Sequence, residues 1–169
     1  MRGLLLAALC VGATAMAACR IEDHTPAGTR RDEDAVQEIV ARYARRLSSR
    51  DWDRVRGLFW RNGTYSGPMV PRSAGNALPI DSALHVIARS LEGPEAATFD
   101  VRTLRTDFRQ EGDLAAVWVT LRRRVPLPGA GPVERDWVEH LVLRRIGSNW
   151  RILSVAGSSV PRGSPRDSR

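Results

Sequence analysis

The first half of the chain repeats apolar residues at the three- and four-residue spacing that places them on one face of a helix. This spacing predicts a helix over residues 32–49. A second, shorter helix is predicted from Trp52 to about Trp60, with Asp51 as its capping residue. A third is predicted from about Ser82 to Leu91, with Asp81 at its start.

After the third helix the period of the apolar residues changes to two, which is the period of a β-strand. Strands are predicted over residues 99–108, with a bulge near Thr103, and over residues 114–125. Residues 135–160 contain two apolar runs on either side of a Gly-Ser-Asn sequence, which predicts a β-hairpin. The segments expected to be turns or loops are residues 61–63, 67–79 and 126–132.

Alternation in the first strand of that hairpin divides its side chains between two faces. One face carries Trp137, Glu139, Leu141 and Leu143, and the other carries Asp136, Val138, His140 and Val142. Helices followed by antiparallel strands predict an α+β domain, in which three helices pack on one face of a curved sheet.

The N-terminus has the pattern of an exported protein. A short positive start is followed by an apolar run, so residues 1–18 are predicted to be a signal peptide. The run is shorter than the roughly 20 residues that a membrane-spanning helix needs. It ends in Met16-Ala17-Ala18-Cys19, which resembles a bacterial lipobox and implies that Cys19 is lipidated. Cleavage after Ala18 without lipid is the alternative.

The state of the two cysteines and the location of the protein follow from this interpretation. If Cys10 is removed with the signal peptide and Cys19 is acylated, the mature chain has neither a free thiol nor a disulfide. A Cys10–Cys19 bridge is the less favoured alternative. Residues 19–31 are then a lipidated tether to the cell envelope on the periplasmic side, and Arg20 beside the cysteine favours the outer membrane by the same resemblance. Residues 32–160 form the domain, and residues 161–169 are expected to be disordered.

The large net charge of the chain says little about its function. The formal net charge is +7, and all 26 basic residues are arginines. These arginines are scattered among acidic residues and form no separate basic segment, so a nucleic-acid-binding surface is not predicted. Export from the cytoplasm argues against that function as well.

Two segments of the chain resemble a known superfamily. They are AVQEIVARYARRLSSRDWDRVRGLFWRNGTY (residues 35–65) and EHLVLRRIGSNWRILSV (residues 139–155). They resemble the opening helices and the closing hairpin of the NTF2-like, or SnoaL-like, superfamily. The resemblance implies a conical, cystatin-like α+β barrel with a pocket between sheet and helices, and frequent homodimerisation through the sheet. The superfamily includes isomerases, cyclases, dehydratases and members that only bind.

Glu139 is the strongest candidate for catalysis. In the enzymatic members of the superfamily an Asp or His in the pocket acts as a base. Burial on an apolar face disfavours the charged form of a carboxyl group, which suits a general base near neutral pH. The favoured alternative is that Glu139 pairs with an arginine on a neighbouring strand, such as Arg122 or Arg124. His85, beside the apolar face of the third helix, is a supporting catalytic candidate or a histidine of the core rim.

The last strand departs from the pattern of the enzymatic members. Those members often have a histidine after the aliphatic residues that follow the tryptophan of this strand. Here Ser154 and the small residues after it occupy these places, which argues against a retained catalytic centre. Ser154 is instead a small polar residue suited to line a cavity.

Aromatic residues are better placed for binding than acidic residues are for catalysis. A mostly apolar pocket is the usual form of a small-molecule site, and core packing is the alternative role for the same side chains. The candidates are Tyr43, Trp52, Phe59, Trp60, Tyr65, Trp118 and Trp137. The sequence has no Gly-rich phosphate loop, metal-ligand spacing or Ser-His-Asp set, so no cofactor or metal is predicted.

Two functions remain open from the sequence. The first is an envelope lipoprotein whose domain binds a small apolar ligand or a partner protein. The second is an enzyme that transfers a proton as ketosteroid isomerases or polyketide cyclases do, using Glu139 with His85 or Tyr43. An enzyme requires Glu139 unpaired in a cavity, whereas a binding protein requires only the cavity. For the binding protein, Glu139→Gln is expected to leave folding nearly unchanged.

Overall fold

The fold is described from a computed structural model, which describes residues 30–70, 76–127 and 130–160. The predicted signal peptide (1–18), the lipidation site Cys19, nearly all of the tether and the C-terminal tail lie outside these residues. Within the described part of the chain, no helix combines the length and the apolar character needed to cross a membrane.

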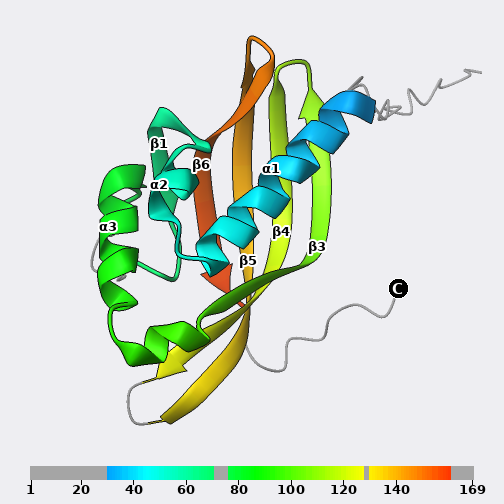
Figure 1. The fold of residues 1–169 in the computed structure, drawn as a ribbon. Helices are drawn as coiled ribbons and strands as arrows, with labels where there is room; N and C mark the ends of the chain where they lie inside the picture. The colour runs from blue at the N-terminus through cyan, green and yellow to red at the C-terminus, as the bar shows by residue number, and fades with distance from the viewer. Residues whose placement is uncertain (1–29, 71–75, 128–129, 161–169) are drawn as a thin grey trace, which may run out of the picture.

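In the described part of the chain, six strands form one mixed sheet in the order β2-β1-β6-β5-β4-β3 (Figure 1). Neighbouring strands are antiparallel except β1 and β6, which are parallel. The helices are α1 (Arg30–Ser48), α2 (Trp52–Arg56), α3 (Ile80–Ser90) and the 3-10 helix η2 (Pro94–Thr98). The strands are β1 (Phe59–Ser66), β2 (Leu78–Pro79), β3 (Asp100–Glu111), β4 (Leu114–Leu127), β5 (Ala130–Ile146) and β6 (Asn149–Ser159).

The helices lie on one face of a curved sheet, as the α+β prediction requires. Figure 1 shows α1 crossing the concave face of the long strands, while α3 lies beside β1. The sheet does not close into a barrel, because β2 and β3 remain as its two edges. The far ends of β4 and β5 bend away beside η2 (Figure 1).

The core lies between α1 and the inner face of the sheet. The apolar face of α1 is buried there against alternate residues of β4 and β5, because both periodicities direct their apolar side chains inward. Buried members include Val36, Ile39, Val40, Tyr43 and Leu47 of α1, Val117, Val119 and Leu121 of β4, and Leu141 and Leu143 of β5.

The prediction for the second helix was too long. The helix α2 ends at Arg56, and Phe59 begins β1, where it pairs with Ile152 of β6. The turn predicted at residues 61–63 is instead part of β1, whose register shifts between Phe59 and Thr64. The parallel partner strand lies far away in the sequence, so local propensity gave no sign of this strand.

Two other boundaries also differ. The helix α3 begins at Ile80, and Asp81 forms an ion pair with Arg56 instead of capping it. The predicted loop at 126–132 is partly strand, because β4 and β5 continue to pair as far as Leu127 and Ala130. A register shift between Val125 and Leu127 accommodates a proline within the ladder.

The bulge and the hairpin turn were predicted correctly. The register of β3 against β4 shifts between Thr103 and Arg105, where the alternation slipped in the sequence. The hairpin of β5 and β6 turns at Gly147, whose φ of 62° is a conformation that favours glycine.

Candidate functional site

A buried ion pair lies on the inner face of the sheet. Arg123 of β4 and Glu139 of β5 are both fully buried, with 0% exposure of their side chains. They continue the inward alternation of their strands, two residues after Leu121 and two residues after Trp137. The Nη2 group of Arg123 donates a hydrogen bond to Oε1 of Glu139.

Two tyrosines from distant elements complete the bonding of this carboxylate. The hydroxyl of Tyr43 in α1 donates to Oε2 of Glu139 at 3.1 Å, and the hydroxyl of Tyr65 in β1 donates to Oε1 at 3.3 Å. The carboxylate therefore accepts from three donors, all inside the core. A buried charge needs such partners, because the interior cannot replace the water that it loses. We call Arg123, Glu139, Tyr43 and Tyr65 the buried cluster.

The protonation of the buried cluster follows from burial and charge. Burial raises the pKa of Tyr43 well above its usual value, and the negative charge of Glu139 raises it further. The pKa of Tyr65 is raised for the same two reasons. Burial alone would lower the pKa of Arg123, but the charge of Glu139 and the interactions with Tyr65 and Tyr43 together outweigh it, and the pKa is raised. Both tyrosines are therefore neutral donors and the guanidinium keeps its charge.

Gly157 of β6 provides the space that Glu139 occupies. The two residues are direct partners across the β5–β6 ladder. A Cβ atom on Gly157 would lie 2.9 Å from Cγ of Glu139 and 3.3 Å from Pro68, closer than such atoms normally approach. The small residue on this strand is thus needed by the buried carboxylate.

Trp137 covers the guanidinium of Arg123. The Cζ atom of Arg123 lies 4.2 Å from the centre of the indole ring, a cation–π contact. Within the described residues, Nε and Nη1 of Arg123 and Nε1 of Trp137 are buried without a hydrogen-bond partner. These unpaired donors carry a desolvation cost that a bound acceptor would relieve.

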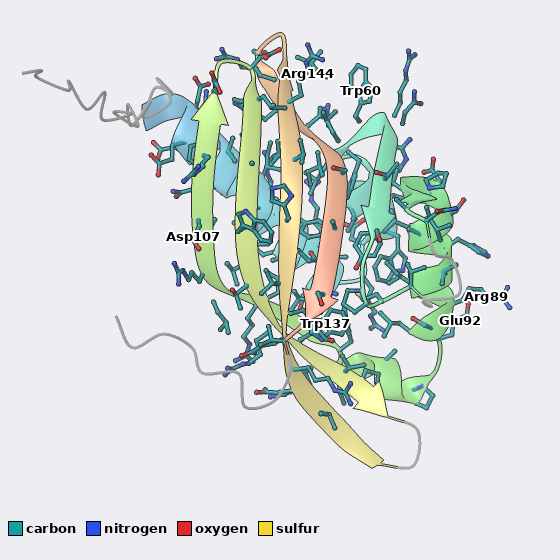
Figure 2. All side chains as sticks on the ribbon, turned by 180° about the vertical axis from the view of Figure 1, so that it is seen from behind. Trp60, Arg89, Glu92, Asp107, Trp137 and Arg144 are labelled. Carbon is teal, nitrogen blue, oxygen red and sulfur yellow. The ribbon has the colours of Figure 1, made fainter. Side chains whose placement is uncertain are left out.

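A cavity of about 280 Å³ adjoins the same tryptophan. It lies where the end of α3, η2 and the bent ends of β4 and β5 come together. In Figure 2 Trp137 lies beside the C-terminal end of β6, consistent with its pairing to Ser159. The lining residues are Pro68, Met69, Ser90, Leu91, Phe99, Val125, Pro126, Val133, Arg135 and Trp137.

The structure brings part of the predicted site together. Tyr43, Tyr65 and Glu139 are in direct contact, and Trp137 joins them through Arg123. Phe59 packs edge-on against Tyr43, with ring centres 6.1 Å apart.

Other predicted site residues lie elsewhere. Trp118 is 55% exposed on the outer face of the sheet, where it stacks on His140 with ring centres 4.5 Å apart. His85 is exposed on α3, and Ser154 pairs with Val142 on the outer side of β5. Trp52 is half-buried against the core.

Arg123 is the residue that the sequence reasoning missed. Arg122 and Arg124 were named as partners for Glu139, but they lie on the outer face and pair with Asp136 and Glu134. The signal was present, because the inward alternation of β4 through Leu121 leads directly to position 123. A charged side chain at the end of an apolar series is ordinarily expected at the surface, because charged residues are rarely buried without a partner.

The hydrogen bonds of Glu139 are those of a residue that stabilises the core. Its carboxylate is held by Arg123 and two hydroxyls, as the ion-pair interpretation anticipated, and the cavity lining does not include it. Among the described side chains, no three His, Cys, Asp or Glu residues are grouped so as to hold a metal ion. The cavity beside Trp137 is therefore the part of this region that offers space to a ligand.

Comparison with known proteins gives a family and a fold. A model of the SnoaL-like domain family matches residues 28–156. A search of curated proteins found no match.

Three solved structures illustrate the similarity. An NTF2-like protein with a cystatin-like fold from Novosphingobium aromaticivorans has 18% identity and a TM-score of 0.61, covering 80% of this chain and 85% of that one. A ketosteroid isomerase-like protein from Erwinia carotovora has 14% identity and a TM-score of 0.61, covering 79% and 99%. The CaMKII hub of S. rosetta has 20% identity and a TM-score of 0.62, covering 75% and 95%. At these identities the likeness shows the fold alone.

Proposed function

Because this chain belongs to the SnoaL-like domain family, we propose that it binds a small, mostly apolar ligand in the cavity beside Trp137. The observation that carries the proposal is the cavity itself, because most of the residues that line it are apolar. Ligand pockets commonly measure about 300–1,000 Å³. A cavity of about 280 Å³ lies just below that range, so the proposed ligand is small.

Proton transfer by Glu139 is the function that the geometry disfavours. A general base needs a lone pair directed at a substrate, within hydrogen-bond reach of the proton that it removes. The Glu139 carboxylate instead faces Arg123 and two tyrosine hydroxyls. A substrate would have to displace these partners inside a packed core, at the cost of leaving a buried charge unpaired.

Filling the cavity tests the binding function. Val133→Trp places a large side chain in the cavity wall, whereas Val138→Trp makes the same change on the outer face of the same strand. Native mass spectrometry of the purified protein and titration with octan-1-ol are the measurements. Wild type and Val138→Trp are expected to bind octan-1-ol, and Val133→Trp is expected to bind it at least about ten-fold more weakly. Equal binding by both variants, or none by wild type, would contradict the proposal.

We also propose that the protein is a lipoprotein of the bacterial cell envelope, anchored through Cys19 on the periplasmic side. Support comes from the apolar start of the chain and the Met-Ala-Ala-Cys sequence. Metabolic labelling with an alkyne fatty acid is expected to mark wild type and Cys10→Ser but not Cys19→Ser. Labelling of Cys19→Ser would contradict the anchor.

A homodimer through the outer face of the sheet is the assembly that we propose. The exposed stack of Trp118 on His140 is the feature of the described surface that supports it, because a large aromatic side chain favours a protein contact. Native mass spectrometry is expected to show a dimer for wild type and a monomer for Trp118→Arg. A monomeric wild type would contradict the assembly, and a pulled-down heterologous protein would favour a different partner.

A further inference from the structure

Two arginines stand directly opposite each other on the inner face of the sheet. Arg123 of β4 and Arg135 of β5 are direct partners in the β4–β5 register. Side chains at such positions lie close together on the same face, and like charges there repel each other. Only the Arg123 side chain is buried, whereas that of Arg135 is exposed, so the two guanidinium groups have different surroundings.

Glu139 balances only one of these two charges. The inward side chains are the odd-numbered ones over residues 115–125 of β4 and residues 133–143 of β5, and their charged members are Arg123, Arg135 and Glu139. Glu139 is committed to Arg123 by the buried ion pair. The acidic residues on either side of Arg135 face outward, where they pair with other arginines. Arg135 therefore has no carboxylate of its own among the inward side chains of β4 and β5.

The uncompensated guanidinium lies at the apolar cavity. Arg135 is part of the cavity lining and, among the described residues, has neither an ion-pair partner nor a side-chain hydrogen bond. The hydroxyl of Ser90, also in the lining, donates to the carbonyl oxygen of Ile87 at 2.7 Å. Behind Trp137, the fully buried Arg123 keeps Nε and Nη1 unpaired, which adds to the positive character of this region.

We propose that the ligand is a small amphipathic monocarboxylate, with its apolar body in the cavity and its carboxylate on the guanidinium of Arg135. A guanidinium is planar and matches a carboxylate through two parallel hydrogen bonds. One uncompensated positive charge balances one negative charge, which favours a carboxylate over a doubly charged phosphate. This inference rests on the proposed binding function and adds the chemical class of the ligand.

A matched pair of ligands tests the inference on the full chain. Octanoate and octan-1-ol have the same apolar tail and differ in the charged head group. Isothermal titration at neutral pH is expected to show octanoate binding at least about ten-fold more tightly than octan-1-ol, as a charge-assisted contact provides. Arg135→Gln is expected to abolish this preference while octan-1-ol binding stays unchanged, and Arg135→Lys to retain part of it.

The control removes one positive charge elsewhere. Arg109 is exposed on the outer face of β3, so Arg109→Gln changes the net charge equally without touching the cavity. It is expected to keep the preference for octanoate. Thermal unfolding of each variant shows whether the fold is retained, and the exposed Arg135 side chain makes a folded Arg135→Gln variant the expected result.

The results of these titrations distinguish the carboxylate inference from the proposed ligand-binding function. If octan-1-ol binds and octanoate is not preferred, the carboxylate inference fails and the binding function stands. If Arg135→Gln keeps the preference, or Arg109→Gln loses it, the assignment to Arg135 fails. If neither compound binds and no small molecule co-purifies, the binding function fails and the inference fails with it.

Discussion

The two faces of the β4–β5 ladder each carry an arginine–carboxylate pair, and the two arginines are neighbours in the sequence. Arg123 and Glu139 are both 0% exposed in the core, whereas Arg122 and Asp136 have 43% and 21% of their side chains exposed on the outer face. The residue types are nearly the same. Successive side chains of a strand point to opposite faces of the sheet, so a difference of one position decides which pair lies in the core.

The same interaction therefore has two different energetic roles. Inside, the charges have lost their water, so removing one partner leaves the other buried and uncompensated. Outside, water and salt screen the pair, and its contribution to stability is small. The outer pair also raises the pKa of Arg122, first through its hydrogen bond with Asp136 and then through the charge of that carboxylate.

Breaking the inner pair is expected to have the largest effect. Glu139→Gln leaves the buried guanidinium of Arg123 without its counter-charge and is expected to lower the free energy of unfolding by about 3–5 kcal/mol. This reverses the expectation from the sequence that the variant folds nearly normally. Chemical denaturation measures the loss.

A double variant sharpens that result. Arg123→Met with Glu139→Leu removes both charges, and it is expected to recover much of the stability that Glu139→Gln loses. A Glu139→Gln variant within about 1 kcal/mol of wild type would contradict the uncompensated-charge explanation.

The two tyrosines are expected to give an intermediate effect that depends on pH. They are the only tyrosines of the chain, and both have a raised pKa in the folded state. The folded protein thus holds these protons more tightly than the unfolded chain, whose tyrosines titrate near pH ~10. Their contribution to stability is present below that pH and is lost as the pH rises above it.

Absorbance of tyrosinate measures this directly. In an alkaline titration the signal is expected to appear together with unfolding, not before it, because each hydroxyl is buried against Glu139. Tyr43→Phe removes one of the three donors and is expected to cost about 1 kcal/mol at neutral pH. A tyrosinate signal in the folded protein near pH ~10 would contradict the buried cluster.

Breaking the outer pair is expected to have the smallest effect. Asp136→Asn removes the charge but keeps the size of the side chain, and is expected to cost about 0–1 kcal/mol. The loss should shrink further at high salt, in contrast to that of Glu139→Gln. Denaturation at low and high ionic strength measures both. A loss as large as that of the inner variant would contradict the comparison.

Much of the fold was predictable because its signals are local. The apolar spacing of α1, the alternation in β5 and the glycine of the hairpin turn each depend on neighbouring residues, and each prediction was confirmed. The strand β1 was partly mistaken for helix and turn. Its ladder partner β6 lies almost a hundred residues later, and a parallel pairing has no local signature.

The candidate site was less predictable than the fold. Alternation correctly placed Glu139 and Trp137 on one face, but the same rule was not extended from Leu121 to Arg123. The exposed position of Trp118 also followed from alternation, yet its size favoured an interior role. An aromatic residue in a strand can be assigned to a pocket only when it is known which face of the sheet its side chain occupies.

The sequence by itself determined that three helices precede the long strands, which faces of β4 and β5 turn inward and that one carboxylate lies on an apolar face. Only the tertiary structure decided which arginine meets that carboxylate, that Tyr43 reaches it across 96 residues, and that a cavity remains beside Trp137. The physical reason is one of range. Periodicity is a property of a short segment, whereas ion pairs and cavities depend on strand register and on how distant elements pack.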